Sequence, residues 1–566
     1  MSGIAIILIS IAVLLAGYLF YGRFLAKKWG IDPKAKTPAY KYRDDNDFVP
    51  SSRGVVYGHQ FASIAGAGPI NGPIQGAVFG WVPVLLWILL GGIFFGAVQD
   101  FAAMYASVKN KGRTIGYIIE LYIGKFGKKL FLAFTWLFSV LVIAAFSDIV
   151  SKTFDGISGT QAVNAAGAQV SIISFSFIFF AIILGLILRK FKLPSFVNSL
   201  IAIGLLVASI LIGLRFPLYL SSDVWQIVIF VYVAVACIAP VWMLLQPRDY
   251  LNSFLLIAMI IAAVIGILVA NPKMNLDAFS GLTVGGQTMF PYLFVTVACG
   301  AISGFHALVS SGTASKQIKN EKDMLPVSFG AMLTESLLAV IALVAVGAKF
   351  TSETVATSGT PSVVFASAIS SFLAVIKVPE DVSFSLITLS VSSFALTSLD
   401  SVARVGRLSW QEFFLDSSIK DEEVHGFRKF LTNGTVATVI MLGLAYALSR
   451  VGYANIWPLF GSSNQLLATL SLIACAVYFR RTKRQGAFLW APMAFMLVTT
   501  LVTLVLTVKS CITSVAAGTA ASIAGAVVQG LFAIAIFILE IIVAGTGLKK
   551  LRAKPQDVPM EEEEAE

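Results

Sequence analysis

Charged side chains are scarce in this sequence of 566 residues. They make up 13% of the residues, whereas a soluble globular domain carries about 25%, and 57% of the residues are hydrophobic. This composition excludes an ordinary soluble domain. The net charge of +11 does not indicate a nucleic-acid partner, because the basic residues lie between apolar runs and do not gather on one face or in one domain.

Sequence motifs for catalysis or nucleotide hydrolysis are also lacking. No Gly-x-x-x-x-Gly-Lys-Ser/Thr loop is present, which excludes a pump driven by ATP through such a loop. Neither a His-Glu-x-x-His motif nor a Ser/His/Asp set is visible. The largest polar stretches, 23–56, 349–381 and 404–430, are too short for an independent catalytic domain. We therefore do not expect an enzyme.

Cysteines are few and widely separated, so neither a disulfide framework nor a zinc site is predicted. Most of them lie inside apolar runs, where a thiol behaves as a small apolar side chain. The four are Cys237, Cys299, Cys475 and Cys511. No cofactor and no metal site are expected.

Long apolar runs fill the rest of the chain. A helix needs about 20 mostly apolar residues to cross a bilayer, and about fifteen such spans can be drawn. Their approximate bounds are 3–22, 57–78, 82–108, 130–150, 171–188, 196–214, 224–244, 252–270, 289–312, 327–348, 382–403, 431–449, 456–479, 487–508 and 523–546. The sequence therefore predicts an all-α, polytopic integral membrane protein with about 15 transmembrane helices.

The basic loops predict the orientation of these spans. With the N-terminus outside, most Lys and Arg residues fall in the cytoplasm, including the loops 109–129 and 404–429. The first apolar run lacks a basic segment before it and is followed by Arg23, so we interpret it as a retained helix and not as a signal peptide.

We divide the chain into three parts on this basis. Residues 1–56 hold the first transmembrane helix and a cytoplasmic basic segment, and residues 57–550 form the transmembrane core. Residues 551–566 form an acidic cytoplasmic tail, which we expect to be disordered.

One span, 57–73, does not have the composition of a lipid-facing helix. It reads Tyr-Gly-His-Gln-Phe-Ala-Ser-Ile-Ala-Gly-Ala-Gly-Pro-Ile-Asn-Gly-Pro, in which Gly and Pro weaken the helical hydrogen-bond ladder. Backbone freed in this way is tolerated at membrane depth only where protein or a water-filled cavity surrounds it. The pattern predicts a broken transmembrane helix that lines a site.

A second stretch, 299–315, has a similar composition and also holds one histidine. His59 to Gly66 resembles His306 to Gly312 within one residue of spacing, and the alternation of spans gives the two stretches opposite directions. An inverted repeat predicts this arrangement, with both broken helices meeting near the midplane. Close helix packing through small residues is the alternative explanation of the glycines.

Carboxylates inside apolar runs are costly, so each is a candidate for function. Asp100 and Glu335 lie well inside their spans, whereas Asp148 and Glu540 lie near span ends, where a solvated or peripheral position explains them equally well. Asp400 either pairs with Arg404, four residues further on, or takes part in ion coupling.

Histidines and hydroxyls complete the candidate chemistry. His59 and His306 alone make an incomplete metal site, so proton relay or a hydrogen bond to the substrate suits them better. Thr397, Ser398 and Ser401 surround Asp400 within little more than one turn. Hard oxygen ligands of this kind suit Na⁺, and a lone carboxylate suits H⁺. Asn464 and Gln465 follow another Pro- and Gly-interrupted segment, which could complete the same cavity.

Four blocks carry a family resemblance. They are Gly-His-Gln-Phe-Ala-Ser-Ile-Ala-Gly-Ala-Gly-Pro at 58–69, Gly-Ala-Val-Gln-Asp-Phe at 96–101, Gln-Pro-Arg-Asp-Tyr at 246–250, and Trp-Pro-Leu-Phe-Gly at 457–461 with Asn464 and Gln465. Their order resembles that of the carbon starvation protein A family. The resemblance implies a bacterial inner-membrane transporter of the amino acid–polyamine–organocation type, with a leucine-transporter-like inverted-repeat core. It also implies uptake of peptides or pyruvate, with H⁺ as the expected coupling ion.

Two registers of the inverted repeat remain open from the sequence. A core of five plus five helices would begin its second half at 224–244, where 239–247 is also broken by proline, whereas the similar composition lies at 289–312. On the first register, the cation-site hydroxyls become Ser310, Ser311 and Thr313 in place of Thr397, Ser398 and Ser401.

The function that we expect is secondary active transport by alternating access, with a channel or a nutrient-sensing receptor as the alternatives. A helix N-terminus exposed at a break suits the carboxylate of pyruvate and that of a peptide equally. The candidate substrate-binding residues are His59, Gln60, Ser63, Gly66, Gly68, Asn71, His306, Ser310, Ser311, Asn464 and Gln465. The candidate ion-coupling residues are Asp100, Thr313, Thr397, Ser398, Asp400 and Ser401, for H⁺ or Na⁺.

Overall fold

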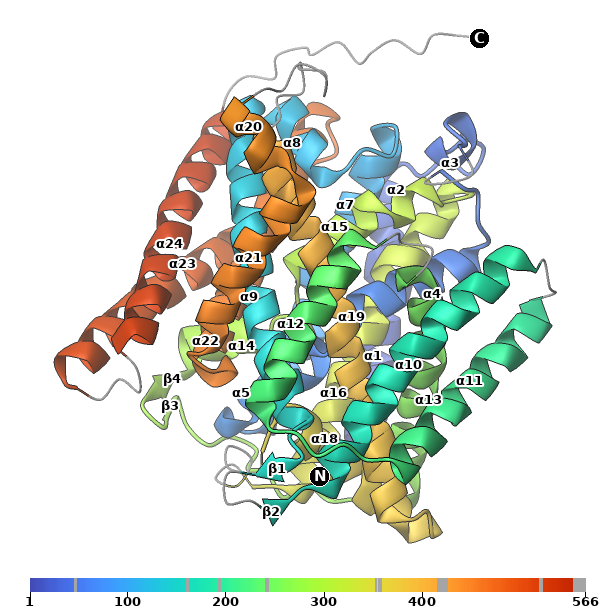
Figure 1. Ribbon diagram of the computed structural model, residues 1–566. Coiled ribbons are helices and arrows are strands. Elements are labelled where there is room, and N and C mark those ends of the chain that lie inside the picture. Colours follow the sequence, from blue (N-terminus) through green and yellow to red (C-terminus); the bar gives the residue numbers. More distant parts are fainter. Residues whose placement is uncertain are drawn as a thin grey trace.

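The computed structural model describes residues 1–44, 48–158, 162–191, 195–239, 244–351, 354, 359–414, 426–518 and 523–552. Helices dominate this part of the chain (Figure 1). The strands in it are two short antiparallel hairpins, β1 (Ile157–Ser158) with β2 (Ala162–Val163) and β3 (Thr283–Val284) with β4 (Gln287–Thr288). Most of the predicted acidic tail, 553–566, lies outside the described residues.

The helices before the second broken span are as follows: α1 (Gly3–Ala16), η1 (Gly17–Gly22), α2 (Arg23–Trp29), α3 (Pro38–Lys41), α4 (Arg53–Ile64), α5 (Gly68–Gly76), η2 (Ala77–Phe79), α6 (Trp81–Gly91), η3 (Gly92–Gly96), α7 (Ala97–Lys109), α8 (Ile115–Tyr122), α9 (Lys125–Thr153), α10 (Ala165–Lys190), α11 (Ser195–Arg215), α12 (Ser222–Ile238) and α13 (Leu245–Ala270).

The remaining helices are α14 (Met289–Thr296), α15 (Gly304–Gly312), η4 (Ala314–Lys316), η5 (Glu321–Asp323), η6 (Leu325–Gly330), α16 (Ala331–Lys349), α18 (Pro361–Leu373), η7 (Ala374–Ile376), α19 (Glu380–Phe414), α20 (Gly426–Thr432), α21 (Gly434–Ser449), α22 (Tyr453–Arg481), α23 (Ala487–Ala516) and α24 (Ile523–Arg552).

The fold is that of a polytopic helical membrane protein, as predicted. Within the described residues, 10 helices are long and apolar enough to cross a membrane, and α20 with α21 forms a further candidate span bent by 63°. Each apolar run drawn from the sequence coincides with a helix or with an interrupted helix pair. The total of about fifteen crossings stays a prediction.

Both predicted breaks are present. The first broken helix stops at Ile64 and resumes at Gly68, and the second stops at Thr296 and resumes at Gly304. The second break therefore lies at 289–312. The alternative partner at 224–244 contains α12, which runs without a break over Ser222–Ile238, and residues 240–243 lie outside the described part.

The two broken helices cross in opposite directions. A Cβ atom placed on Gly68 would lie 2.4 Å from Cys299 Sγ, and one on Gly72 would lie 2.8 Å from the carbonyl oxygen of Thr296. Earlier in the first broken helix, the Gln60 side chain donates to Ser310 in the later half of the second broken helix. Partner numbers fall as the first helix advances, so the pair is antiparallel, as an inverted repeat requires.

The packing repeats in the same inverted way. Helix α9 packs on α19, and each of them contacts two helices of the other half: α9 contacts α21 and α22, and α19 contacts α12 and α13. Helix α5 packs on α16 as α15 packs on α7. The short helix α8 contacts α9 and α22, just as α18 contacts α19 and α13. The repeat units are therefore α4–α9 with α12–α13, and α14–α22.

An inserted helix pair explains the register that the sequence left open. Helices α10 and α11 pack on each other between α9 and α12, outside the repeat, and Figure 1 shows them on the flank of the bundle opposite α23 and α24. A pair of antiparallel spans returns the chain to the same side of the membrane. The insertion therefore moves the second half two spans further along the chain while its inverted direction is kept.

The stretch 349–381 differs from the expectation of an outer polar segment. Helix α18 (Pro361–Leu373) lies within it, and most of its side chains are buried against α5, α13, α16 and α19. The apolar helix, Pro361–Ile376, is shorter than the roughly 20 residues that a transmembrane helix needs, so no span is predicted there from the sequence. Helix α19 also extends to Phe414, beyond the predicted end at 403.

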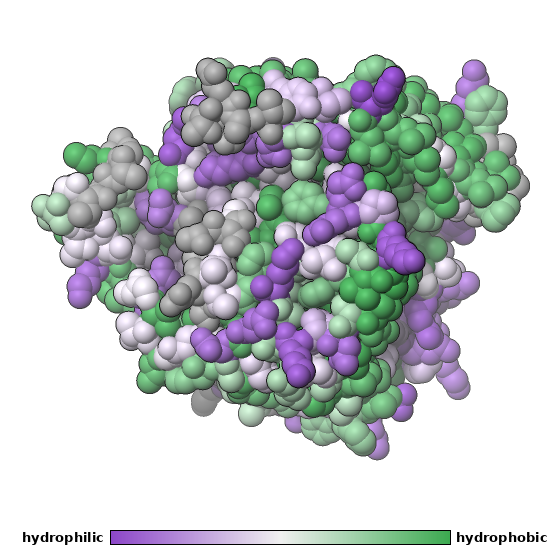
Figure 2. Space-filling model, turned by 90° about the horizontal axis from the view of Figure 1, so that it is seen from below, coloured by the Kyte–Doolittle hydropathy of each residue, from purple (hydrophilic) through white to green (hydrophobic). Residues whose placement is uncertain are grey.

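The end of the molecule that holds the N-terminus carries hydrophilic side chains. Figure 2 looks onto this end and shows a hydrophilic band that crosses the face between hydrophobic margins. Such a band is expected where helix ends meet water and lipid-facing surfaces surround them.

Close packing of α22 on the second break yields a stability prediction. A Cβ atom on Gly304 would lie 2.4 Å from the backbone nitrogen of Ala468 and 2.5 Å from the carbonyl oxygen of Asn464. We expect Gly304→Ala to lower stability by about 1–3 kcal/mol through overpacking. Gly443→Ala is the matched control, since a Cβ atom there meets nothing within 4 Å. Thermal unfolding of the purified proteins in detergent measures this difference. Equal melting temperatures of the parent and both variants would contradict the prediction.

Candidate functional site

Side chains from neighbouring helices satisfy the backbone of the second break. Trp87 Nε1 donates to the carbonyl oxygen of Val297 at 3.0 Å, and Trp457 Nε1 donates to that of Thr296 at 3.3 Å. Gln99 donates to the carbonyl oxygen of Ser303 at 2.7 Å. These donors explain how a helix can stop at membrane depth, where unpaired carbonyl groups are costly.

Asn464 and Gln465 belong to this same support. Gln465 donates to the carbonyl oxygen of Phe294. Asn464 Oδ1 accepts from Ser303 Oγ at 3.1 Å and from the backbone nitrogen of Phe305 at 3.3 Å, at the first turn of α15. Both side chains are buried. The structure therefore places these two candidate substrate ligands at the backbone of the broken helix.

The first break has fewer side-chain partners. Its last carbonyls accept from Ala65 N and Gly66 N at 2.8 Å each, and α5 then begins with Gly68 and Pro69. Asn71, in the first turn of α5, is fully buried, and neither amide atom of its side chain has a hydrogen-bond partner among the described residues. Buried polar groups are normally paired, so Asn71 is a candidate ligand-binding group.

Three helices present partly exposed stripes that lead to the breaks. Residues spaced three or four apart share one face of a helix. On α4 and the break after it they are Gly58, His59, Ala62, Ser63 and Gly66; on α15 and just after it, Phe305, Leu308, Val309, Gly312 and Thr313; and on α19, Thr397, Ser398, Ser401 and Arg404. The α4 and α19 stripes meet where Gly66 contacts Ser398.

Beyond the breaks the same helices are closed. All residues of 67–74 and of 295–298 are buried, and so are 389–396 on α19. The exposed residues of these three helices therefore lead to the breaks from one end of the molecule and not from the other.

Contacts beneath the stripes join α4 to α15. His59 Nε2 lies 3.2 Å from Thr313 Oγ1, and the buried Gln60 amide donates to Ser310 Oγ at 2.7 Å. Ser311 Oγ accepts from the backbone nitrogen of Ile115 at 3.1 Å, which joins α15 to α8. Of the predicted walls, Ser63 and Gly66 remain accessible, whereas Gln60, Ser310 and Ser311 are engaged within the protein.

A buried charged cluster lies beside the second break. His306 Nδ1 is 3.1 Å from Asp100 Oδ2, and His306 Nε2 is 3.2 Å from Glu335 Oε2. The three side chains are 1%, 0% and 0% exposed, respectively. One imidazole therefore lies between two carboxyl groups on three different helices, α15, α7 and α16.

The two carboxyl groups come from equivalent positions of the inverted repeat. Asp100 follows the π-helical segment η3, and Glu335 follows the π-helical segment η6, on the helices that succeed the first and second broken spans. Segments of this kind often occur at functional sites, because they shift the side chains that follow them. The histidines are not equivalent: His306 is buried in the cluster, whereas His59 lies on the exposed stripe.

Charge balance determines how many protons this cluster can hold. No charge of either sign is stable in isolation at such depth, so the favoured state is neutral overall. A neutral cluster holds two protons more than a neutral imidazole with two carboxylates. It contains either an imidazolium, one carboxylate and one protonated carboxyl group, or a neutral imidazole and two protonated carboxyl groups. Among the described residues, no group of three or more His, Cys, Asp or Glu side chains is placed to hold a metal ion.

Asp400 belongs to a second buried centre. It forms an ion pair with Arg248 of α13, and Tyr232 of α12 donates to Asp400 Oδ2 at 2.6 Å. The expected alternative, a pair with Arg404, is wrong: the Arg404 guanidinium donates to the carbonyl oxygens of Ala236 and Ala239 at the end of α12. The spacing of four residues along one helix favours an Asp400–Arg404 pair, but both side chains bind partners on other helices instead.

Of the predicted cation-site hydroxyls, that of Thr397 accepts from a donor of the protein. The Asn252 amide of α13 donates to Thr397 Oγ1, and Thr397 in turn donates to the carbonyl oxygen of Ser393 at 2.9 Å. Ser398 donates to the carbonyl oxygen of Phe394 at 3.0 Å. A hydroxyl oxygen that already accepts an N–H donor is a poorer ligand for Na⁺.

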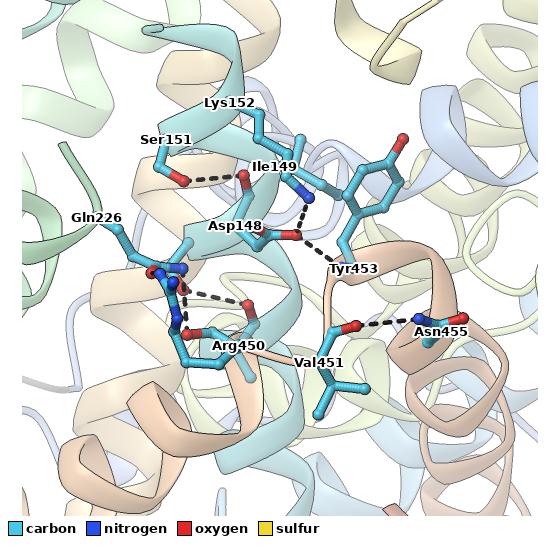
Figure 3. A network of polar contacts seen from close by, with 12 residues as sticks. Asp148, Ile149, Ser151, Lys152, Gln226, Arg450, Val451, Tyr453 and Asn455 are labelled. Atoms are coloured by element: carbon cyan, nitrogen blue, oxygen red, sulfur yellow. Dashed lines mark hydrogen bonds and ion pairs between the residues drawn. The ribbon is translucent and has the colours of Figure 1, made fainter. Parts of the chain in front are cut away.

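The two remaining carboxylates have structural partners. Asp148 accepts from Lys152 Nζ at 2.8 Å and from the backbone nitrogen of Tyr453 at 2.7 Å, so it caps the first turn of α22 (Figure 3). Glu540 is buried between α23 and α24, where Thr500 donates to it.

Three residues of these centres cannot be assigned from the sequence alone. Glu335 was noted as an intramembrane acid, but nothing in the sequence connected it with His306. Arg248 lies in the block at 246–250, and its charge inside an apolar region was the available signal. Tyr232 carries no such signal, because aromatic residues are common in membrane helices.

A family model and several known proteins are similar to this chain. The family model of the carbon starvation protein CstA matches residues 2–349 and 345–504. The peptide transporter CstA of Bacillus subtilis (strain 168) is 31% identical over 88% of this chain and 89% of its own length. The pyruvate/proton symporter BtsT of Escherichia coli (strain K12) is 36% identical over 61% of this chain and 49% of its own length.

More distant similarity exists to solved structures. A crystal structure of the manganese transporter of Eremococcus coleocola aligns over 90% of this chain with 13% identity and a TM-score of 0.47. This similarity is too weak for a comparison of sites.

The Arg248–Asp400 pair yields a prediction about stability. Arg248→Met leaves a buried carboxylate without its cation, and the loss of one partner costs about 3–5 kcal/mol. The double variant Arg248→Met, Asp400→Leu removes both charges and should melt at a higher temperature than the single variant. Thermal unfolding in detergent measures this, and Tyr232→Phe is the control that keeps both charges. A double variant that is less stable than Arg248→Met would contradict the prediction.

Proposed function

The chain belongs to the carbon starvation protein CstA family, and on this basis we propose that it takes up a small carboxylate-bearing nutrient by alternating access, in symport with H⁺. The substrate classes are a short peptide or pyruvate, because two of its relatives are named a peptide transporter and a pyruvate/proton symporter. The observation that carries the proposal is the Asp100–His306–Glu335 cluster beside the two antiparallel breaks.

The proposed substrate site lies where the accessible stripes end. Ser63, Gly66 and Ser398 are partly exposed there, and Cys299 is partly exposed on the opposite broken helix. Helix α5 begins at this point, so the positive end of its dipole faces the site and favours a carboxylate. Gly68 lets the two broken helices approach, and the unpaired amide of Asn71 supplies a further donor and acceptor.

The proposed coupling site is the cluster itself. His306 is on α15, which lines the accessible route, whereas Asp100 and Glu335 are on helices behind it. A displacement of α15 relative to α7 and α16 changes both distances from the imidazole at once. Proton binding and release at the cluster would thereby depend on the side to which the site is open.

H⁺ is proposed in preference to Na⁺ for a structural reason. Thr397 Oγ1, one of the candidate Na⁺ ligands, already accepts a hydrogen bond from the Asn252 amide. Asp400 is paired with a permanently charged guanidinium, which competes with any added cation.

The proposed orientation follows the basic residues. Arg53, Lys109 and Lys316 lie at the end from which the breaks are accessible, and basic residues favour the cytoplasmic side. We infer a bacterial inner-membrane location with the N-terminus outside, the C-terminus in the cytoplasm, and a conformation that is open to the cytoplasm.

Uptake into proteoliposomes tests the coupling. Labelled pyruvate and a labelled dipeptide are offered separately, and pH and Na⁺ gradients are imposed one at a time. We expect accumulation of one of them with the pH gradient. Asp100→Asn and Glu335→Gln should each reduce accumulation at least tenfold while counterflow exchange at equal pH persists, which also shows that the variants fold.

Glu540→Gln is the matched control, a buried carboxyl group outside the cluster, and should accumulate substrate normally. Full accumulation by Asp100→Asn would remove the cluster from the mechanism. Uptake that never exceeds the substrate's own electrochemical gradient would indicate a channel.

Labelling of single cysteines tests the direction of access. A Cβ atom on Gly58 or Gly312 meets nothing within 4 Å, so cysteine fits at both positions. In a background that lacks the native cysteines, a membrane-impermeant maleimide should label Gly58→Cys and Gly312→Cys from the cytoplasmic side and not from the outside. Ala395→Cys, in the closed stretch of α19, is the buried control. Labelling from the outside alone would reverse the proposed orientation.

A further inference from the structure

A basic cavity of about 610 Å³ lies at the end of the molecule where α4 begins. Three separate segments line it: the chain between α2 and α3 with the start of α3, the first residue of α4, and the connection from α15 to α16. Its lining residues are Pro33, Lys34, Ala35, Lys36, Tyr40, Arg53, Lys319, Asn320, Lys322 and Asp323. The cavity is an open depression of the surface and not an enclosed pocket.

The lining is strongly biased toward positive charge. Lys34, Lys36, Arg53, Lys319 and Lys322 face a single acidic lining residue, Asp323. The neighbouring Glu321 is buried and turned away from the cavity, because it binds Lys109 Nζ at 2.6 Å and the backbone nitrogen of Asp32 at 2.9 Å.

The shape of the cavity is held by hydrogen bonds between its segments. Asn320 Nδ2 donates to the carbonyl oxygen of Pro33 at 2.8 Å, and Arg53 Nε lies 2.6 Å from Asp323 Oδ1. Backbone pairing between Ser51 and Ile318 supports the same arrangement. Three segments are thus held together around an open cavity, and the lysines that line it are exposed to solvent.

We propose that this cavity binds a phosphate-bearing anion. Converging Lys and Arg side chains are the usual ligands of phosphate oxygens, and the N-terminus of α4, a helix of 12 residues, adds the positive end of its dipole. The candidate span Gly3–Trp29 ends, and the candidate span Glu321–Lys349 begins, close to this cavity in the sequence, so the cavity lies at the level of the membrane surface. An anionic lipid headgroup and a dissolved phosphate compound are the two sources of this chemistry there.

Binding has a consequence for transport, and this consequence rests on the proposed function. Arg53 is the first residue of α4, the half-helix whose exposed stripe leads to the break. An anion that contacts Arg53 together with lysines of the other two segments ties α4 to both of them. It therefore stabilises the present conformation and slows its conversion to the opposite one.

Thermal unfolding of the full-length protein tests the binding. In detergent at constant ionic strength, inorganic phosphate or pyrophosphate should raise the melting temperature in a saturable way if the site accepts a dissolved anion. In nanodiscs, phosphatidylglycerol should raise it relative to phosphatidylcholine if the site accepts a headgroup. The double variant Lys34→Gln, Lys322→Gln should weaken the apparent affinity at least tenfold.

Lys125→Gln, Lys129→Gln is the matched control, since both lysines are exposed and neither lines the cavity. The proposal is overturned if neither the phosphates nor phosphatidylglycerol gives a saturable shift, or if the two double variants respond alike, as for nonspecific surface charge.

Uptake by the same variants separates the two claims. Initial rates should increase in Lys34→Gln, Lys322→Gln relative to the parent when the anion that gave the thermal shift is present at saturation. If this double variant loses the thermal shift but keeps the uptake rate of the parent, the anion-binding site is supported and its effect on transport is refuted. Because unfolding needs no transport, the failure of the proposed function would not alter the binding result.

Discussion

Hydrogen bonding of the peptide backbone at membrane depth is the constraint on which this structure depends. Two helices stop near the centre of the bundle, and each unpaired backbone group there would cost several kcal/mol, on the order of the transfer of an amide into hydrocarbon. Trp87, Gln99, Trp457 and Gln465 supply donors to the second break. The close approach of α22 through Gly304 follows from the same need, because short amide side chains must reach the broken backbone.

Two buried centres of charge stand near these breaks, and their chemistry differs. The Arg248–Asp400 pair contains a guanidinium that keeps its charge, so it serves to hold α13 against α19 without proton exchange. The Asp100–His306–Glu335 cluster contains an imidazole between two carboxyl groups, all of which can change protonation. Its members come from three helices, so their separation responds to relative helix movement. One centre is suited to stability and the other to coupling.

Much of the architecture could be predicted from composition alone. The scarcity of charge, the apolar runs and the Gly- and Pro-rich stretches at 57–73 and 299–315 indicated a helical membrane protein with two broken helices, and both breaks are present. The sequence did not reveal helix α18, because its apolar run, Pro361–Ile376, is shorter than the roughly 20 residues of a transmembrane helix. It also could not choose the register of the repeat, because the inserted α10–α11 pair leaves the alternation of directions unchanged.

The candidate site divides in a similar way. The sequence by itself determined which residues are costly inside a membrane, and so identified Asp100, His306 and Asp400 as groups that need partners, since that cost depends on residue type and depth. The partners were decided by tertiary structure. Glu335 reaches His306 from a different helix, Arg248 replaces Arg404 beside Asp400, and Asn464 and Gln465 bind the broken backbone. Contacts between residues far apart in the chain depend on how whole helices cross, and local spacing carries no information about that crossing.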